Sequence, residues 1–146
     1  MIEIDERNIF ELIRASEQLS NEMVFRWTKS FPQNLGISPI LVLHELKEQG
    51  PQKQTELANK LGYTPGAMTN ISNRLIKAGY ASRLNDEKDR RIVRLALTES
   101  GVAFLKKAQQ KGTELRKSIF ENLEDEEVKQ YLQIHQKLLK NLRAEN

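Results

Sequence analysis

The chain has 146 residues, 38% of them hydrophobic, and carries 23 Lys and Arg against 20 Asp and Glu, a net charge of +3. This length suits one domain with a buried core. The absence of cysteine excludes disulfides, thiol nucleophiles and cysteine-based zinc sites, and two distant histidines, His44 and His135, do not suggest a metal site. We therefore expect no cofactor and no metal.

The sequence also carries no sign of a membrane span or a leader. No apolar run approaches roughly 18 to 20 residues, and the first five residues are acidic rather than basic and then apolar. We expect a cytoplasmic protein with no membrane partner.

The first 31 residues contain neither Gly nor Pro and carry a helical pattern. Apolar side chains recur there at spacings of three and four, with charged residues between them. The apolar set is Ile9, Phe10, Leu12, Ile13, Leu19, Met23, Val24, Trp27 and Phe31. The pattern predicts one long amphipathic helix.

Residues 32–79 hold all four prolines and five of the seven glycines, which predicts short elements joined by turns. An apolar helix is predicted over 39–49 and a second helix over 53–61, with Gly62 as its C-cap. A third helix is predicted over 65–78, with Thr64 as its N-cap and proline in its first position. The second and third helices, joined by a tight glycine-containing turn, form a helix-turn-helix.

The third predicted helix is polar on one side. Met68, Ile71 and Leu75 are expected to be buried, and hydrogen-bonding side chains follow on the other side, namely Thr69, Asn70, Ser72, Asn73 and Arg74. A slim polar helix fits a DNA major groove about 12 Å wide. We predict DNA contacts from Thr64, Pro65, Gly66, Ala67, Met68, Thr69, Asn70, Asn73 and Arg74. The alternative is an ordinary solvated helix.

The hydrophobic period changes from helix to strand after Gly79. Residues 80–84 and 92–97 are predicted strands, the second with Val93, Leu95 and Leu97 on one face, and the polar link between them makes a hairpin. Arginine at its tip can enter a narrow minor groove. We predict DNA contacts from Lys88, Asp89, Arg90 and Arg91, with Asp89 orienting an arginine. The alternative is a solvated hairpin tip.

Two further helices are predicted in the last third. Thr98 is a plausible N-cap for a helix that continues to Phe120, and a break at 122–125 precedes a second amphipathic helix through Leu142. Apolar stripes on both ends of a small protein need a partner surface, and a homodimer supplies one. An intramolecular helical bundle is the alternative.

The net charge is unevenly distributed. Residues 51–94 hold nine basic and four acidic side chains, a net +5, so the rest of the chain carries −2. A basic middle segment between mildly acidic flanks is typical of a surface that meets a polyanion, although a solvated face of mixed charge gives similar counts.

These motifs together resemble the MarR family of winged helix-turn-helix transcription regulators. The resemblance rests on Asp89-Arg90-Arg91, the alternating strand and Leu97-Thr98-Glu99-Ser100-Gly101, after a polar helix ending Asn73-Arg74-Leu75 and the exit Gly79-Tyr80. It covers essentially the whole chain. It implies a mainly α fold with a small β-hairpin wing, with a DNA-binding lobe over 36–97 and dimerisation helices over 1–31 and 98–146.

The resemblance also implies a function. Members are homodimers that bind double-stranded DNA at pseudo-palindromic operators, usually as repressors. By this likeness Arg91 is the minor-groove arginine, Asp89 is its partner, and Thr69, Asn70, Asn73 and Arg74 read the major groove. The peroxide-sensing branch uses a cysteine that this chain lacks, and the zinc-sensing branch does not fit so few His and no Cys.

Many members bind small aromatic or phenolic acids in a crevice beside the dimerisation helices. Trp27, Phe31 and His44 would line such a crevice here, with Arg14 or Arg26 meeting a carboxylate, unless the aromatic residues belong to the core. A winged-helix module that binds a protein instead of DNA is the alternative function. An enzyme is not expected, because no nucleophile, base and orienting residue occur together.

Overall fold

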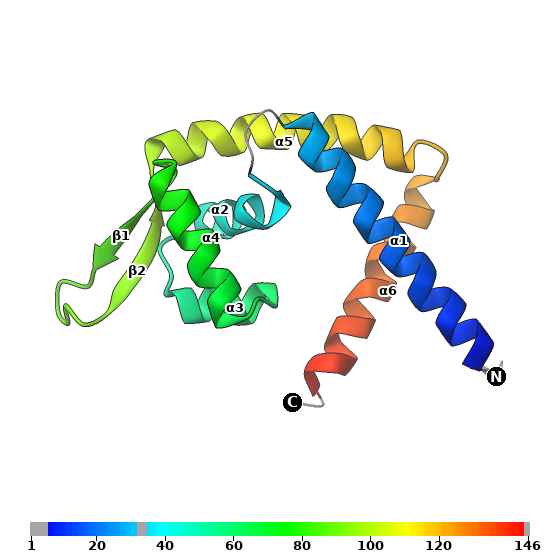
Figure 1. Cartoon of the computed structure of the whole chain (residues 1–146), viewed down its shortest axis with the longest axis horizontal. Helices are drawn as coiled ribbons and strands as arrows, with labels where there is room; N and C mark the ends of the chain where they lie inside the picture. Colours follow the sequence, from blue (N-terminus) through cyan, green and yellow to red (C-terminus); the bar gives the residue numbers. More distant parts are fainter. Residues whose placement is uncertain (1–5, 32–34, 145–146) are drawn as a thin grey trace. The chain divides into compact units, whose positions relative to one another are not determined.

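The structure is a computed structural model that describes residues 6–31 and 35–144. The extreme ends of the two predicted dimerisation regions, residues 1–5 and 145–146, lie outside the described residues. The described residues form six α-helices and one two-stranded sheet, which confirms the predicted mainly α fold with a hairpin (Figure 1). The elements are α1 (Glu6–Ser30), α2 (Ile37–Gln49), α3 (Gln54–Leu61), α4 (Pro65–Lys77), β1 (Ala81–Asn85), β2 (Val93–Leu97), α5 (Glu99–Phe120) and α6 (Asp125–Ala144).

The ends of α4 follow from its sequence. Thr64 caps the first turn, because its Oγ accepts a hydrogen bond from the Ala67 N–H at 3.1 Å, and Pro65 occupies the first helical position. At the other end Gly79 adopts φ +84°, a left-handed conformation that favours glycine, and the Tyr80 N–H then donates to the Leu75 carbonyl at 2.9 Å. The chain thus leaves α4 directly into β1.

One core holds α2 to β2 together with the first half of α5. Its largest fully buried side chains come from five elements and are Leu43, Leu57, Met68, Leu75, Leu95 and Leu105. The core packs against one side of α4 and leaves the opposite side of this helix exposed to solvent. Residues 36–97, which the resemblance predicts to be the DNA-binding lobe and which we call the lobe, are therefore held by packing within one chain.

The hairpin of β1 and β2 is antiparallel, with register from Ala81 opposite Leu97 to Asn85 opposite Val93. Its base is tied to the loop before α3, because the backbones of Gln52 and Leu95 exchange two hydrogen bonds of 3.1 and 2.7 Å. Burial in β2 follows distance from the tip rather than the predicted alternation of faces, because Leu95 and Ala96, on opposite faces, are both buried. Leu95 is buried at the base, whereas Val93, on the same predicted face but nearer the projecting tip, is 40% exposed (Figure 1).

Helix α5 enters the core only with its first half. Thr98 is its N-cap, as predicted: its Oγ accepts from the Gly101 N–H at 3.0 Å and donates to the Gly79 carbonyl at 2.7 Å. Phe104 stacks on Tyr80 and meets Phe31 edge-on, with ring centroids 4.2 and 5.3 Å apart. The buried positions of α5 end at Ala108.

The chain divides into two compact units, 1–111 and 112–146. The second unit contains α6, none of whose described residues is buried although leucines and other apolar residues follow one side of it. Within the first unit, α1 likewise leaves Phe10, Leu12 and Ile13 more than half exposed. Among the described residues, no helix combines the length and apolar character needed to cross a bilayer.

Candidate nucleic-acid interface

The exposed side of α4 forms a shallow polar hollow of about 460 Å³. Its lining residues, which we call the recognition face, are Gly66, Thr69, Asn70, Asn73, Arg74 and Lys77. Their spacing of three and four residues places them on one side of the helix, opposite the core. The structure therefore brings together the four predicted base-reading side chains, Thr69, Asn70, Asn73 and Arg74, on one accessible surface.

Two predicted positions of α4 lie on its buried side instead. Met68 is 1% exposed, which confirms its predicted core position and contradicts its inclusion among the DNA-contacting residues. The sequence predicts Ser72 among the exposed polar side chains, but the structure shows that it is fully buried. The reason is helical geometry, because positions 68 and 72 are four apart and lie beside Ile71 and Leu75. Among the described residues, the Ser72 Oγ has no hydrogen-bond partner.

At the wing tip, residues 86–92, Asp89 holds Arg91 as predicted. The Asp89 carboxylate accepts from Arg91 Nε at 3.0 Å and from a terminal guanidinium nitrogen at 3.1 Å, a bidentate pair. The Arg91 side chain is nevertheless 92% exposed. The hydrogen bonds lower the pKa of Asp89 and raise the pKa of Arg91, so the arginine stays charged and oriented at the tip.

A second carboxylate, that of Asp86, holds the wing tip in place through hydrogen bonds. Asp86 accepts hydrogen bonds from the backbone N–H groups of Lys88 and Asp89 at 2.8 and 3.2 Å, and from Arg94 at 2.7 Å. The Arg94 hydrogen bond, followed by the two backbone hydrogen bonds, lowers the pKa of Asp86 to about 2. Asp86 therefore orders the tip rather than facing a ligand, a role that the sequence analysis did not assign.

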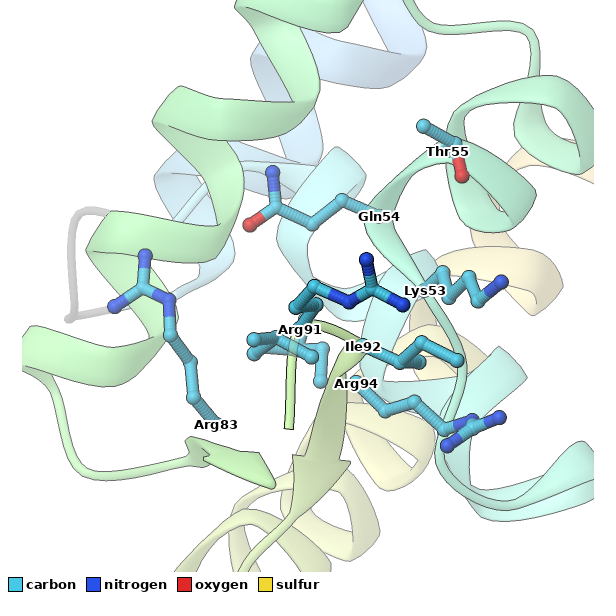
Figure 2. Close-up of a pocket in the computed structure, with 9 residues that line it drawn as sticks. Lys53, Gln54, Thr55, Arg83, Arg91, Ile92 and Arg94 are labelled. Carbon is cyan, nitrogen blue, oxygen red and sulfur yellow. The ribbon is translucent and has the colours of Figure 1, made fainter. Parts of the chain in front are cut away.

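A basic pocket of about 450 Å³ lies between the wing and the start of α3 (Figure 2). Four of its lining side chains are cationic, namely Lys53, Arg83, Arg91 and Arg94, and none of its lining side chains is acidic. Lys53, Arg83 and Arg94 contribute to the positive charge of residues 51–94, but their sequence positions do not predict that they share a site. Their positions depend on how β1, β2 and α3 meet, which charge counting does not show.

Figure 2 shows Arg83 extending from β1 toward α4. A guanidinium nitrogen of Arg83 donates to Asn73 Oδ1 at 3.0 Å. The wing and the recognition face are thus joined by a side-chain hydrogen bond, and basic and polar groups continue from one to the other.

The predicted effector residues are only partly brought together. Trp27 and Phe31 are 6% and 8% exposed and stack with ring centroids 5.7 Å apart. Arg26 and His44 are exposed. Arg14 lies 13 residues before Trp27 on the same helix, which corresponds to roughly 20 Å along its axis, so the two cannot contact one ligand within a single protomer.

Histidine and carboxylate side chains do not gather into a metal centre in the described part of the chain. The chemistry of the two surfaces is hydrogen bonding and positive charge. Arginine and asparagine can reach base edges, and lysine and arginine can neutralise phosphates. No acid, base and nucleophile meet on the recognition face or at the wing tip.

Comparison with known proteins matches this geometry. The model of the MarR family matches residues 37–93. An HTH-type transcriptional regulator of Bacillus cereus is 33% identical over 124 residues, which cover 85% of this chain and 78% of that protein. Among solved structures, the transcriptional regulator BldR of Sulfolobus solfataricus has a TM-score of 0.83 and 25% identity, covering 97% of this chain and 99% of its own.

A second solved structure agrees in fold alone. The PcaV transcriptional regulator of Streptomyces coelicolor, determined in complex with its natural ligand, has a TM-score of 0.83 at 15% identity and covers 96% of this chain and 98% of its own. A helix-turn-helix with a polar recognition face and a basic wing defines a DNA-binding transcriptional regulator. The chain belongs to the MarR family of such regulators. The proteins it resembles are regulators and not enzymes.

Proposed function

We propose that the protein is a homodimeric repressor that binds a pseudo-palindromic operator in double-stranded DNA. The observation that carries this proposal is the continuous surface of the recognition face and the wing, on which Asp89 presents an arginine that is 92% exposed. α4 would enter a major groove, and Arg91 would enter the adjacent minor groove, whose negative potential favours guanidinium. Duplex DNA as the partner also implies action in the compartment that holds the chromosome.

A homodimer would suit this mode of binding. Leu132, Leu138 and Leu142 of α6 are between 53% and 64% exposed, and α1 adds further exposed apolar residues. Burying such stripes against a second copy removes them from water. Two lobes related by a two-fold axis would then dock in successive major grooves about 34 Å apart, which explains a preference for pseudo-palindromic sites.

We further propose that a small aromatic or phenolic acid regulates the dimer near Trp27. The indole Nε1 is buried and has no hydrogen-bond partner among the described residues, so an acceptor on a ligand would satisfy it. Arg26 directly precedes Trp27 on the same helix and could meet a carboxylate. The ligand complex of the PcaV regulator supports this proposal by analogy of fold. Release would follow from a change in the separation of the two lobes.

DNA binding is tested by titrating the protein into fluorescent duplexes at several salt concentrations. We expect tight, sequence-selective binding. The logarithm of the association constant should fall linearly with the logarithm of the salt concentration. Replacing Arg91 by Ala should weaken operator binding about tenfold and reduce the salt slope by about one, with the dimer intact. Lys107→Ala, an exposed lysine of α5 outside both surfaces, is the matched control. Absence of salt-dependent duplex binding would instead favour a protein-binding module.

A further inference from the structure

The hydrogen bond between Arg83 and Asn73 fixes which chemical groups part of the recognition face presents. Arg83 stands on β1 and Asn73 on α4, and both side chains are exposed on the side that we assign to DNA. The bond spans 3.0 Å from the guanidinium to Asn73 Oδ1. Guanidinium groups carry only donors, so the amide oxygen must be the atom that faces Arg83.

The consequence is a small group of donors, formed by Asn73 and Arg83 together. With its oxygen turned to Arg83, Asn73 presents its NH₂ group to the solvent, and Arg83 adds its own remaining N–H groups beside it. The adjoining pocket holds Arg83 among Lys53, Arg91 and Arg94, with no carboxylate in its lining to compete for the guanidinium. Arg83 is therefore available to stay with the amide.

Base edges in the major groove differ in what such a surface can meet. An asparagine that reads adenine uses its oxygen to accept from N6 and its NH₂ group to donate to N7. Guanine presents two acceptors, O6 and N7, at the same positions. A surface of donors alone matches guanine and opposes the N6 amino group of adenine with another donor.

We propose that Arg83 is a positioning residue that turns Asn73 from an adenine-reading into a guanine-reading side chain. The proposal rests on the proposed function, because it requires α4 to lie in a major groove. Arg83 acts through the orientation of the Asn73 amide rather than through charge alone. Exclusion of water at the interface strengthens the hydrogen bond, so the orientation seen in the free protein is kept in the complex.

The test is selection of duplexes from a randomised pool by the full-length protein, followed by sequencing. The parent should select a guanine at one position in each half-site. Arg83→Ala frees Asn73 Oδ1, so the ratio of guanine to adenine at that position should fall roughly tenfold while the other positions keep their preferences. The same shift should not appear in Lys107→Ala, which removes an equal charge from α5, outside the recognition face and the wing.

A double-mutant comparison separates positioning from direct reading. In an Asn73→Ala background, adding Arg83→Ala should change the base preference no further, because the amide that Arg83 orients is gone. A guanine preference that survives Asn73→Ala, or an Arg83→Ala protein that selects the parental motif with uniformly lower affinity, would overturn the proposal and leave the DNA-binding function standing. A parent that selects no motif would overturn both. Circular dichroism melting checks that the variants, altered at exposed positions, remain folded.

Discussion

The lobe and the terminal helices α1 and α6 differ in how far they bury their apolar residues. In the lobe, Leu43, Leu57 and Leu75 are completely buried, and the exposed side of α4 is polar. In α6, no described residue is buried and the leucines face solvent. A lobe packed in this way depends on its own chain, whereas α6 depends on what covers it. The same sequence therefore builds a lobe that buries its own apolar residues and a helix, α6, whose apolar residues are exposed in the single chain.

The largest effect is expected in α6, at the interface of the proposed dimer. If that dimer is symmetric, Leu138→Glu with Leu142→Glu places four carboxylates in its interface. Each buried leucine is worth about 1.5 to 3 kcal/mol, so we expect the dimer dissociation constant to rise at least about a thousandfold. Sedimentation velocity at several concentrations measures it. Gln133→Glu puts the same acid on the opposite side of α6 and should leave the dimer unchanged; equal behaviour of the two proteins would argue against this interface.

The second-largest effect is expected from a substitution in the core of the lobe. Leu75→Ala leaves a cavity at a fully buried position of α4 and should lower the free energy of unfolding by about 2 to 5 kcal/mol. Leu84→Ala removes the same atoms from a wing residue that is 49% exposed, and it should cost much less. Urea unfolding followed by circular dichroism compares the two. Similar losses in the free energy of unfolding would contradict the packing, which indicates that the core of the lobe depends on α4.

Two glycines, one within the lobe and one at its junction with α5, differ in the space that an added Cβ would have. A Cβ on Gly101 would collide with the Tyr80 carbonyl oxygen and lie 2.7 Å from Leu97 Cδ1, whereas a Cβ on Gly66 meets nothing within 4 Å. Gly101→Ala should therefore destabilise the fold by about 1 to 3 kcal/mol. Gly66→Ala, in a helix, should stabilise it by about 0.5 to 1 kcal/mol. Thermal unfolding of both variants tests this sign difference, and a stable Gly101→Ala protein would contradict the close approach.

The sequence predicted the lobe better than the contacts across it. Gly and Pro punctuation, the Thr64 and Thr98 caps and the change of period at the hairpin were sufficient to place its helices and strands. The prediction for Ser72 is wrong because its polarity suggests exposure, whereas its spacing of four from the buried Met68 places it on the buried side of α4. Small side chains fit a core in spite of a hydroxyl group, which residue type alone does not reveal.

The site was less predictable where it depends on contacts between elements. The pair Asp89 and Arg91, two residues apart, follows from a local turn and was anticipated. The bond from Arg83 to Asn73 joins a strand to a helix, and its existence depends on how β1 leaves α4 and on a rotamer. Periodicity fixes the side of an element on which a residue lies. It does not fix which polar atom on a neighbouring element that residue meets.

The smallest effect concerns the order of the wing tip. Because the pKa of Asp86 is lowered to about 2 from 3.8, its contribution to the folded wing is complete above about pH 4 and is lost as the pH falls through 2. Carboxyl ¹³C NMR should give a titration midpoint near 2 for Asp86. Arg94→Gln removes the main cause of the shift and should move the midpoint toward 3.8, whereas Arg90→Gln, which removes a charge that does not contact Asp86, should leave it unchanged. Equal midpoints in the parent and the Arg94 variant would mean that the Asp86–Arg94 pair does not hold the wing.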